Sequence, residues 1–268
     1  RHAQRARLRR RRGLPRAHPA APVTASTLGA GLPLSLIVFA FNEATNVPLV
    51  LPEIVTWLQR RGAPFELVFV DDGSTDGTAA AARAVFANTG LSDREGQVLR
   101  HERNRGIGAA LKSGVRAARL PWVTFLPCDG QIAPGELDTL LNAAEQEGVA
   151  LVFSVYRDRD DGWQRTLLSA AIRGLIQGLF GVYMRSDGPY LFRRELFDPD
   201  LLVPDTFFLN FEFPIRVLRA GKPHQVVAIH CQRRRTGQSK STGIRRILGV
   251  ARDLVGFRMR LPRSSSLR

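Results

Sequence analysis

The sequence predicts an α/β fold in which helices cover both faces of a mostly parallel sheet. From Leu34 onward, short apolar runs alternate with segments of helical periodicity, which is typical of parallel strands joined by helical crossovers. The turn Asp71–Thr78 supports this fold, because it follows the apolar run Phe65–Val70 and precedes an Ala-rich helical segment. Ligands of open α/β sheets bind at the carboxyl ends of strands, so two adjacent carboxylates there predict a polar ligand.

The order of the elements follows from the spacing of apolar residues. Strands are expected where apolar residues are contiguous, at 34–41, 65–70, 97–100, 122–126 and 149–153. Helices are expected where they recur at helical spacing, at 46–61, from Thr78, and at about 107–119, 134–147, 163–181 and 244–261. Pro134 suits the first turn of its helix. The glycines at 106, 108 and 114 do not form the dinucleotide-binding fingerprint, so that type of site is not indicated.

The small residues of the turn after the paired carboxylates have expected roles of their own. Gly73 and Gly77 allow close backbone approach, and Ser74 and Thr75 are expected to cap the next helix. The alternative is an ordinary surface turn, because Asp, Gly, Ser and Thr are all common in turns.

Charge and composition divide the 268 residues into three parts. Eight arginines before residue 17 supply more than half of the net charge of +15. Pro and Gly interrupt the stretch 17–33, so residues 1–33 are expected to be a disordered basic arm and linker rather than a signal peptide. One α/β domain is expected at 34–242, followed by an amphipathic basic helix and tail at 243–268. Uninterrupted apolar runs fall short of the roughly 18 residues that a spanning helix needs, so the chain is not expected to cross a membrane.

The positive charge fits an anionic membrane surface or a phosphorylated substrate as well as nucleic acid. The sequence contains no basic stripe studded with aromatic residues, so no nucleic acid is expected among the partners. Cys128 and Cys231 are isolated. They indicate neither a disulfide framework nor a Cys-rich zinc site, and a reducing compartment is expected.

Four segments together carry a family resemblance. Residues 38–46, the Asp71–Thr78 turn, residues 104–110 and residues 129–131 resemble family 2 glycosyltransferases in that family's order and spacing. They are most similar to the branch of dolichyl-phosphate mannosyltransferase-like, polyprenyl-phosphate glycosyltransferases, and the resemblance covers about residues 34–242. It implies a GT-A fold and transfer of a sugar from a nucleotide-diphosphate donor with inversion of the anomeric centre.

The resemblance also implies where the nucleotide binds. It places Ala40, Phe41 and Glu43 at the base and ribose, with Asp71 and Asp72 at the base. The chemistry agrees, because carboxylates accept hydrogen bonds from base N–H groups and a Phe ring offers a packing face. For Glu43 alone, a solvated acid at a helix start is the alternative.

A second part of the donor site is expected at the helix that begins after Asn104. Gly106 and Gly108 lie in its first turn, where free backbone N–H groups would suit a phosphate. An ordinary Gly-rich turn is the alternative.

A divalent metal, Mg²⁺ or Mn²⁺, is implied by the resemblance, with one departure. The family's motif is Asp-x-Asp followed two residues later by Gln. Here Pro127 replaces the first Asp, and Asp129 and Gln131 match the rest. Mg²⁺ commonly takes only one or two carboxylates together with substrate phosphates. Cys128, between these residues, is expected to be packed rather than nucleophilic.

The acceptor side is expected in the second half of the chain. Asp187 loosely matches an acid of the family, and Arg234 and Lys240 occupy the basic positions of its Arg-x-x-Gly-x-Ser-Lys signature. Opposed cations can hold a diphosphate leaving group and an acceptor phosphate together. A solvated charged loop is the alternative. Glu212, a lone acid among aromatic residues, would need a partner such as a sugar hydroxyl or an Arg.

Two predicted helices, 163–181 and 244–261, combine apolar spacing with basic residues. Core packing is the plain interpretation of such a pattern, but the resemblance favours interfacial membrane helices. The expected location is therefore cytoplasmic, peripherally associated with the inner face of the cell membrane.

The function expected from these observations is transfer of a hexosyl group from a nucleotide-diphosphate sugar to a polyprenyl phosphate. One alternative is a soluble or polysaccharide acceptor, for which Asp187 would serve as base. Another is a catalytically inactive GT-A module that acts as a scaffold, which Pro127 makes conceivable.

Overall fold

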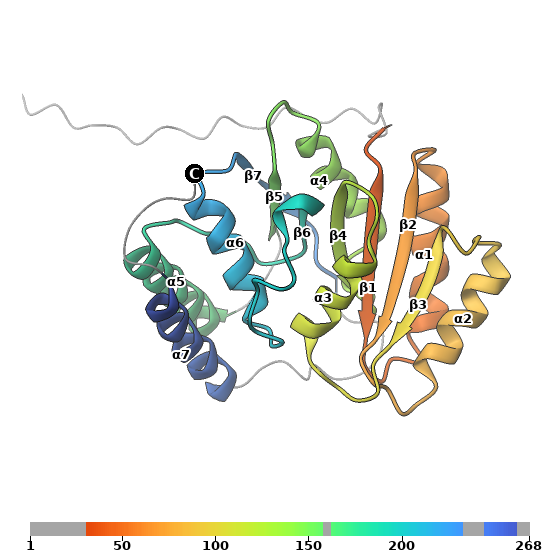
Figure 1. Ribbon diagram of the computed structural model, residues 1–268, viewed down its shortest axis with the longest axis horizontal. Coiled ribbons are helices and arrows are strands. Elements are labelled where there is room, and N and C mark those ends of the chain that lie inside the picture. The colour runs from red at the N-terminus through yellow and green to blue at the C-terminus, as the bar shows by residue number, and fades with distance from the viewer. Residues whose placement is uncertain (1–30, 158–161, 233–243, 262–268) are drawn as a thin grey trace, which may run out of the picture.

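The structure, a computed structural model, describes residues 31–157, 162–232 and 244–261. Its centre is a seven-stranded sheet with the order β3-β2-β1-β4-β6-β5-β7 (Figure 1). Strand β6 is antiparallel to both of its neighbours and the other pairs are parallel. The bounds of the strands are β1 Leu34–Ala40, β2 Phe65–Asp71, β3 Gly96–Arg100, β4 Trp122–Pro127, β5 Leu151–Tyr156, β6 Tyr190–Arg193 and β7 His224–Ile229.

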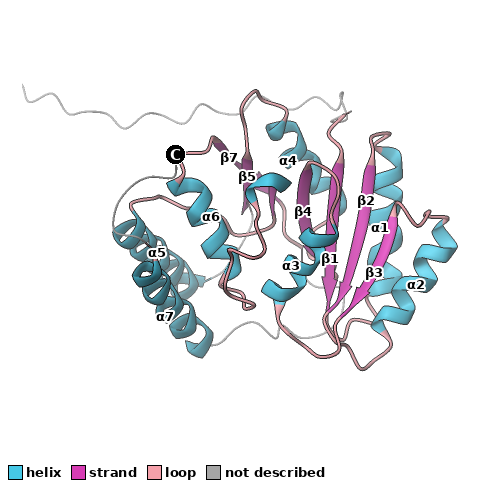
Figure 2. Cartoon of the chain, viewed as in Figure 1, coloured by secondary structure: helices cyan, strands magenta, loops and turns pink. Residues whose placement is uncertain are grey.

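Helices cover both faces of this sheet, as Figure 2 shows. Apolar residues of α1, α2 and α4 form the core on one face, and those of α3, α5, α6 and α7 form the core on the other. Leu36 and Val38 of β1 belong to the first core and Ile37 to the second, as the alternation of side chains along a strand requires. The helices are α1 Val47–Arg60, α2 Thr78–Thr89, α3 Ile107–Ala117, α4 Leu137–Ala144, α5 Gly162–Phe180, α6 Leu209–Arg219 and α7 Ile244–Arg260, with single 3₁₀ turns η1 Pro134–Glu136 and η2 Arg194–Leu196.

The mostly parallel α/β sheet predicted from the sequence is confirmed, with five strands where they were expected. Elements β6, α6 and β7 were not predicted. Strand β6 has only four residues and ends in Arg193, so its apolar run is too short to be recognised. Its place between β4 and β5 depends on pairing between distant segments, which local periodicity does not report.

The two helices expected at a membrane surface pack partly into the protein. On α7, Val250, Leu254 and Phe257 are buried, and the Phe257 ring lies 5.3 Å from that of Phe180 at the end of α5. The inner stripe of α7 is therefore core, as the plain interpretation of its pattern had it. The outward side of the same helix exposes Arg252, Val255 and Met259. Among the described residues, helices long and apolar enough to span a bilayer are absent.

Candidate active site

The carboxyl ends of three adjacent parallel strands bring the predicted donor-site residues together. Ala40 at the end of β1 is in register with Asp71 of β2, and Phe39 is in register with Pro127 of β4. The backbone N–H of Cys128 donates to the Phe39 carbonyl over 3.0 Å. The segments that carry Phe41, Glu43, Asp72 and Asp129 therefore leave the sheet side by side.

Asp71 is a buried carboxylate whose two oxygens have different surroundings. Oδ1 accepts a hydrogen bond from the Ser74 backbone N–H over 2.9 Å. Oδ2 is buried and accepts no hydrogen bond from the described residues. Arg100 Nε lies 3.5 Å from Oδ2 and forms a long ion pair with it. Because buried carboxylates are normally saturated with hydrogen bonds, Oδ2 is suited to accept one from a bound group.

Asp72, by contrast, is held by the protein itself. Its Oδ1 lies 2.7 Å from His101 Nδ1 and accepts from the Arg105 backbone N–H over 2.9 Å. Its Oδ2 accepts from the Gly106 N–H over 2.8 Å. On the other side of the imidazole, His101 Nε2 lies 2.9 Å from Ser113 Oγ in α3. Asp72 and His101 thus fix the start of α3 to the end of β2, and contact of Asp72 with a base stays a prediction.

The expected phosphate cradle at the start of α3 is corrected in part by these contacts. The N–H groups of Arg105 and Gly106 are taken by Asp72, and that of Ala109 donates to the Asp205 carbonyl over 3.1 Å. A Cβ on Gly108 would lie 2.5 Å from the Thr206 carbonyl oxygen. The small residues at this turn are therefore required for close packing against the 205–206 backbone. Phosphate binding by Gly106 and Gly108 stays a prediction.

Asp205 connects this turn to α3 through its side chain as well. Its Oδ1 accepts from Lys112 Nζ over 3.0 Å, and Oδ2 lies 3.4 Å from Arg105 Nη2. Burial alone would raise the pKa of Asp205, but the hydrogen bonds and charges of Lys112 and Arg105 hold it below its ordinary value. Sequence reasoning missed both His101 and Asp205. A signal for His101 existed, because it directly follows a predicted strand at the ligand-binding edge.

The β1–α1 loop and the Asp71–Thr78 turn hold each other in place. Ser74 Oγ accepts from the Asn42 N–H over 2.8 Å, and Asn42 Oδ1 accepts from the Thr75 N–H over 3.0 Å. Ser74 therefore does not cap α2 as expected, and the N-cap residue, Gly77, makes no side-chain cap hydrogen bond. Asp76, one residue earlier, accepts through Oδ1 from the N–H of Thr78, the first residue of α2, over 3.1 Å.

The nearby acid Glu43 is also bound within the protein. Its Oε2 accepts from Asn46 Nδ2 over 2.6 Å. The half-buried Phe41 and Glu43 lie at the site edge, and their contact with a nucleotide stays a prediction.

The segment with the incomplete metal motif is buried beside this loop. Asp129 is buried, and its Oδ1 accepts from the Gln131 N–H over 3.1 Å. Burial raises the pKa of the Cys128 thiol, and the charges of Glu43 and Asp129 raise it further, so Cys128 has no thiolate character. Clusters of three or more His, Cys, Asp or Glu side chains able to hold a metal are absent from the described part of the chain.

The acceptor-side predictions have mixed outcomes. Asp187 is exposed, and its backbone N–H donates to the Ser154 carbonyl over 2.9 Å. Glu212 is fully buried and has the Arg partner that was one of the two expected. Its Oε1 accepts from Nη2 and Nε of Arg216 over 2.7 and 3.0 Å. Arg234 and Lys240 lie outside the described residues. Gln232, which directly precedes that stretch, donates its N–H to the Gln131 carbonyl over 2.7 Å.

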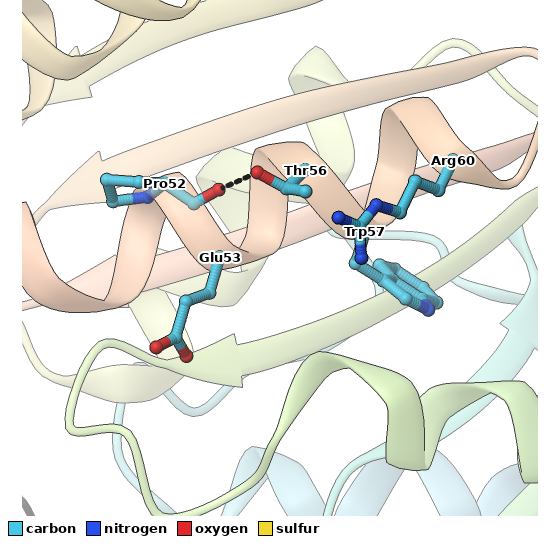
Figure 3. Close-up of a pocket in the computed structure, with 5 residues that line it drawn as sticks. All are labelled: Pro52, Glu53, Thr56, Trp57 and Arg60. Carbon is cyan, nitrogen blue, oxygen red and sulfur yellow. Dashed lines mark hydrogen bonds between the residues drawn. The ribbon is translucent and has the colours of Figure 1, made fainter.

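A shallow hollow on the surface of α1 is separate from these strand ends. Figure 3 shows its lining residues, all from this one helix: Pro52, Glu53, Thr56, Trp57 and Arg60. The Thr56 hydroxyl donates to the Pro52 carbonyl within the helix over 2.8 Å. None of the predicted site residues lines the hollow.

Comparison with known proteins finds a family model and curated relatives that match most of this domain. The family model described as glycosyl transferase family 2 matches residues 35–209. An undecaprenyl-phosphate 4-deoxy-4-formamido-L-arabinose transferase from Aeromonas hydrophila is 32% identical over 167 residues, which are 62% of this chain and 50% of that protein. A dodecaprenyl-phosphate galacturonate synthase from Rhizobium johnstonii is 30% identical over 158 residues, or 59% and 46% of the two chains. The chain thus spans about half the length of these relatives.

Solved structures share the arrangement of the whole domain. Glucosyl-3-phosphoglycerate synthase from Mycobacterium tuberculosis, solved with Mg²⁺ and uridine diphosphate, gives a TM-score of 0.65 at 22% identity over 90% of this chain and 86% of that one. Mannosyl-3-phosphoglycerate synthase from Rubrobacter xylanophilus gives 0.61 at 21% identity over 88% and 77%. At such identities the likeness establishes the fold alone, and the predicted GT-A fold is confirmed.

Proposed function

Because the chain belongs to glycosyl transferase family 2, we propose that it transfers a sugar from a nucleotide diphosphate to a polyprenyl phosphate. Relatives named as transferases or synthases of undecaprenyl-phosphate and dodecaprenyl-phosphate sugars support this acceptor class. The observation that carries the donor half of the proposal is the unsaturated oxygen of Asp71 at the carboxyl edge of the sheet. Of the predicted ribose and base residues, Ala40 ends β1 beside Asp71, and Phe41 and Glu43 lie on the loop that follows.

The surroundings of Asp71 favour uracil over guanine as the base. Guanine presents two adjacent N–H donors, which a carboxylate accepts with the best geometry when each oxygen takes one of them. In this site Oδ1 already accepts from the Ser74 N–H, so Oδ2 is the oxygen without a partner and a single donor is enough to satisfy it. Uracil presents a single N–H between two carbonyls. The guanidinium of Arg100, 3.5 Å from Oδ2, can donate to one of those carbonyls, so we propose a uridine-diphosphate donor.

The leaving diphosphate needs positive charge near Asp129. The site residues fit a Mg²⁺ or Mn²⁺ ion that is shared with the substrate, since Asp129 and Gln131 offer two side chains and Pro127 offers none. A bound ion would neutralise charge that develops on the leaving group. Arg234 and Lys240 are proposed to contribute further positive charge. The Gln232–Gln131 hydrogen bond supports this, because it brings the chain to the metal motif just before the basic segment begins.

The reaction requires alignment more than proton transfer. A phosphate oxygen of the acceptor attacks the anomeric carbon while the bond from that carbon to the donor's diphosphate oxygen breaks. Because the attacking phosphate is already anionic, no strong general base is needed. The exposed position of Asp187 agrees with a reaction that uses no general base. An acceptor that carries a proton on its attacking oxygen would instead require a base such as Asp187.

A lipid acceptor implies a bilayer surface, and α7 supports peripheral attachment. Its outward stripe places Arg252, Val255 and Met259 at positions i, i+3 and i+7, a combination of cation and apolar groups that suits an interface. Attachment at the cytoplasmic face of the cell membrane belongs to the same proposal.

The experiment that tests the function is a transfer assay with a panel of nucleotide sugars and a polyprenyl phosphate, with and without chelator. We expect transfer from a uridine-diphosphate sugar that Mg²⁺ or Mn²⁺ stimulates. Asp129→Ala should lower the rate at least roughly 100-fold, because the leaving diphosphate loses its neutralising ion. Full activity in chelator would contradict the role of the metal. Inactivity with every donor, metal and acceptor would favour a scaffold.

A further inference from the structure

The loop between η2 and α6 displays large apolar side chains at the site edge. Leu201 and Val203 are each 63% exposed and Phe207 is 45% exposed. Monomeric proteins rarely gather such groups without a use for them. Among the described residues, the other exposed large apolar side chains are Leu49, Tyr183, Val226, Val255 and Met259.

The loop that carries these side chains is anchored to the protein by its buried residues and by hydrogen bonds. Leu202 and Phe208 are buried in the core that α3, α5, α6 and α7 share. Between these two anchors, Lys112 Nζ donates to the Val203 carbonyl over 3.1 Å and to Asp205 over 3.0 Å. The carboxylate of Asp205 is thus paired with Lys112, although 44% of its side chain is exposed, while Leu201 and Val203 on the same loop are 63% exposed.

The position of the loop connects it to both the active site and α7. Its 205–206 backbone packs against the first turn of α3, at the edge where the strand arrows of Figure 1 end. The Phe208 ring lies 6.0 Å from that of Phe257 in α7. The loop therefore lies between the catalytic edge and the helix whose outward stripe carries Arg252, Val255 and Met259.

We propose that Leu201, Val203 and Phe207 insert into the surface of an anionic bilayer beside α7. The inference rests on the proposed lipid acceptor, whose phosphate must reach the sheet edge from the membrane. The charge of the protein favours anionic lipid as the occupant. Exposed arginines flank the apolar groups of α7, and of the net charge of +15 a surplus of +7 remains without the eight arginines before residue 17. Two of the three acids of the loop are compensated, since Asp200 pairs with Arg116 at 2.5 Å and Asp205 with Lys112. The third, Asp198, is exposed and accepts from the Asp200 N–H over 2.9 Å.

Cosedimentation of the full chain with vesicles of phosphatidylcholine and phosphatidylglycerol tests this surface. We expect the double variant Leu201→Ser/Val203→Ser to bind roughly tenfold or more weakly, because two apolar side chains no longer leave water. The matched control is Leu49→Ser, which removes an exposed apolar side chain from α1 on the other face of the sheet. It should bind as the unaltered chain does. Unchanged melting temperatures would show that each variant is folded.

A local probe separates this surface from the basic arm, which could also bind vesicles. A polarity-sensitive dye on Val203→Cys, with Cys231→Ser to remove the partly exposed thiol, should shift its emission when vesicles are added. The same dye on Thr56→Cys in α1 should not. Vesicle binding with no shift at 203 would overturn the loop surface and leave the proposed function standing. Failure of the unaltered chain to bind any vesicle would overturn both. A shift that depends on protein concentration without vesicles would assign the loop to self-association and overturn the proposal.

Discussion

Strand β2 carries a buried carboxylate near each end, and the two are treated differently by the protein. Glu66 lies at the amino end, where its Oε1 accepts from the Ser35 hydroxyl over 2.6 Å and from the N–H groups of Arg119 and Leu120. Its Oε2 accepts from Arg119 Nε over 2.8 Å. Asp71 ends the strand with one oxygen that accepts no hydrogen bond from the described residues. The amino end is saturated, whereas the carboxyl end is prepared for a ligand.

The difference separates stability from function along a single strand. A buried carboxylate is tolerable only when hydrogen bonds and charges replace the water it has lost. Glu66 satisfies this condition entirely within the protein, so its role is to join β1, β2 and the turn before β4. Asp71 satisfies it in part, which is an energetic cost for the empty protein and a gain when a donor group arrives.

The largest expected effect is on stability at the amino end. Glu66→Ala should lower the free energy of unfolding by about 3 kcal/mol, because the buried Ser35 hydroxyl and the Arg119 backbone N–H would lose their acceptor and the Arg119 side chain its ion pair. Asp71→Ala, the matched truncation on the same strand, should cost clearly less. Urea denaturation of both variants measures this. Equal losses would mean that the two ends of β2 do not differ as described.

Nucleotide binding should depend on Asp71 and not on Glu66, the reverse of their order of importance for stability. Asp71→Asn keeps the shape and the Ser74 hydrogen bond, but it replaces the free oxygen by an N–H donor that repels a base N–H. We expect binding of uridine diphosphate to weaken by about 1–3 kcal/mol with little change in unfolding free energy. Calorimetry gives the affinity, and Glu66→Gln is the control that should bind normally. Unaltered affinity in Asp71→Asn would remove this carboxylate from the base site.

Much of this contrast was predictable from the sequence, and part was not. Asp71 could be identified because paired acids directly follow an apolar run. The local sequence is enough to recognise that run as a strand and the acids as its carboxyl end. Glu66 was overlooked inside the same run, although a charge within a buried strand needs a partner by itself. Its partners Ser35 and Arg119 are 31 and 53 residues away, and local periodicity does not report such pairs.

The rest of the site shows the same limit. Local pattern placed the Asp71–Thr78 turn and the start of α3 correctly. The local pattern also predicted free N–H groups at the start of α3, but Asp72 and Asp205 accept hydrogen bonds from them. Folding brings these two acceptors in from other parts of the chain, and local spacing does not reveal them. The capping residue of α2 was misassigned for the same reason. Ser74 is engaged by Asn42 across the neighbouring loop.

Acid should lower the free energy of unfolding by protonating Glu66 at the amino end of β2, and Glu66→Gln should remove this contribution. Burial alone would raise the pKa of Glu66, but hydrogen bonds from Arg119, Ser35 and Leu120 hold it below its ordinary value of 4.5. A lowered folded-state pKa means that the contribution is complete above about pH 4.5 and is lost as pH falls through the folded value. Unfolding free energy measured from pH 6 to pH 3 should therefore fall less steeply in Glu66→Gln. An identical slope would show that Glu66 does not contribute to acid sensitivity.

The smallest expected effect concerns Arg119 and Arg100, the arginines that pair with the carboxylates at the two ends of β2. Comparing them tests how the geometry of an ion pair affects stability when solvent exposure is the same. The side chains of Arg119 and Arg100 are 55% and 56% exposed, so solvent should screen both pairs to a similar degree. Arg119 Nε lies 2.8 Å from the Glu66 carboxylate, whereas Arg100 Nε lies 3.5 Å from that of Asp71. Arg119→Ala should therefore cost about 1 kcal/mol of unfolding free energy and Arg100→Ala no more than about 0.5 kcal/mol.

The two substitutions should also differ in their effect on the donor. Arg100→Ala should weaken uridine-diphosphate binding severalfold, because a carbonyl of the base would lose its donor beside Asp71. Arg119→Ala should leave binding unchanged, since Glu66 lies at the opposite end of the strand. Denaturation and calorimetry on the same two preparations decide the matter. If Arg100→Ala proves the more destabilising and binds nucleotide normally, Arg100 belongs to the framework and the carboxyl end of β2 is more nearly saturated than its hydrogen bonds indicate.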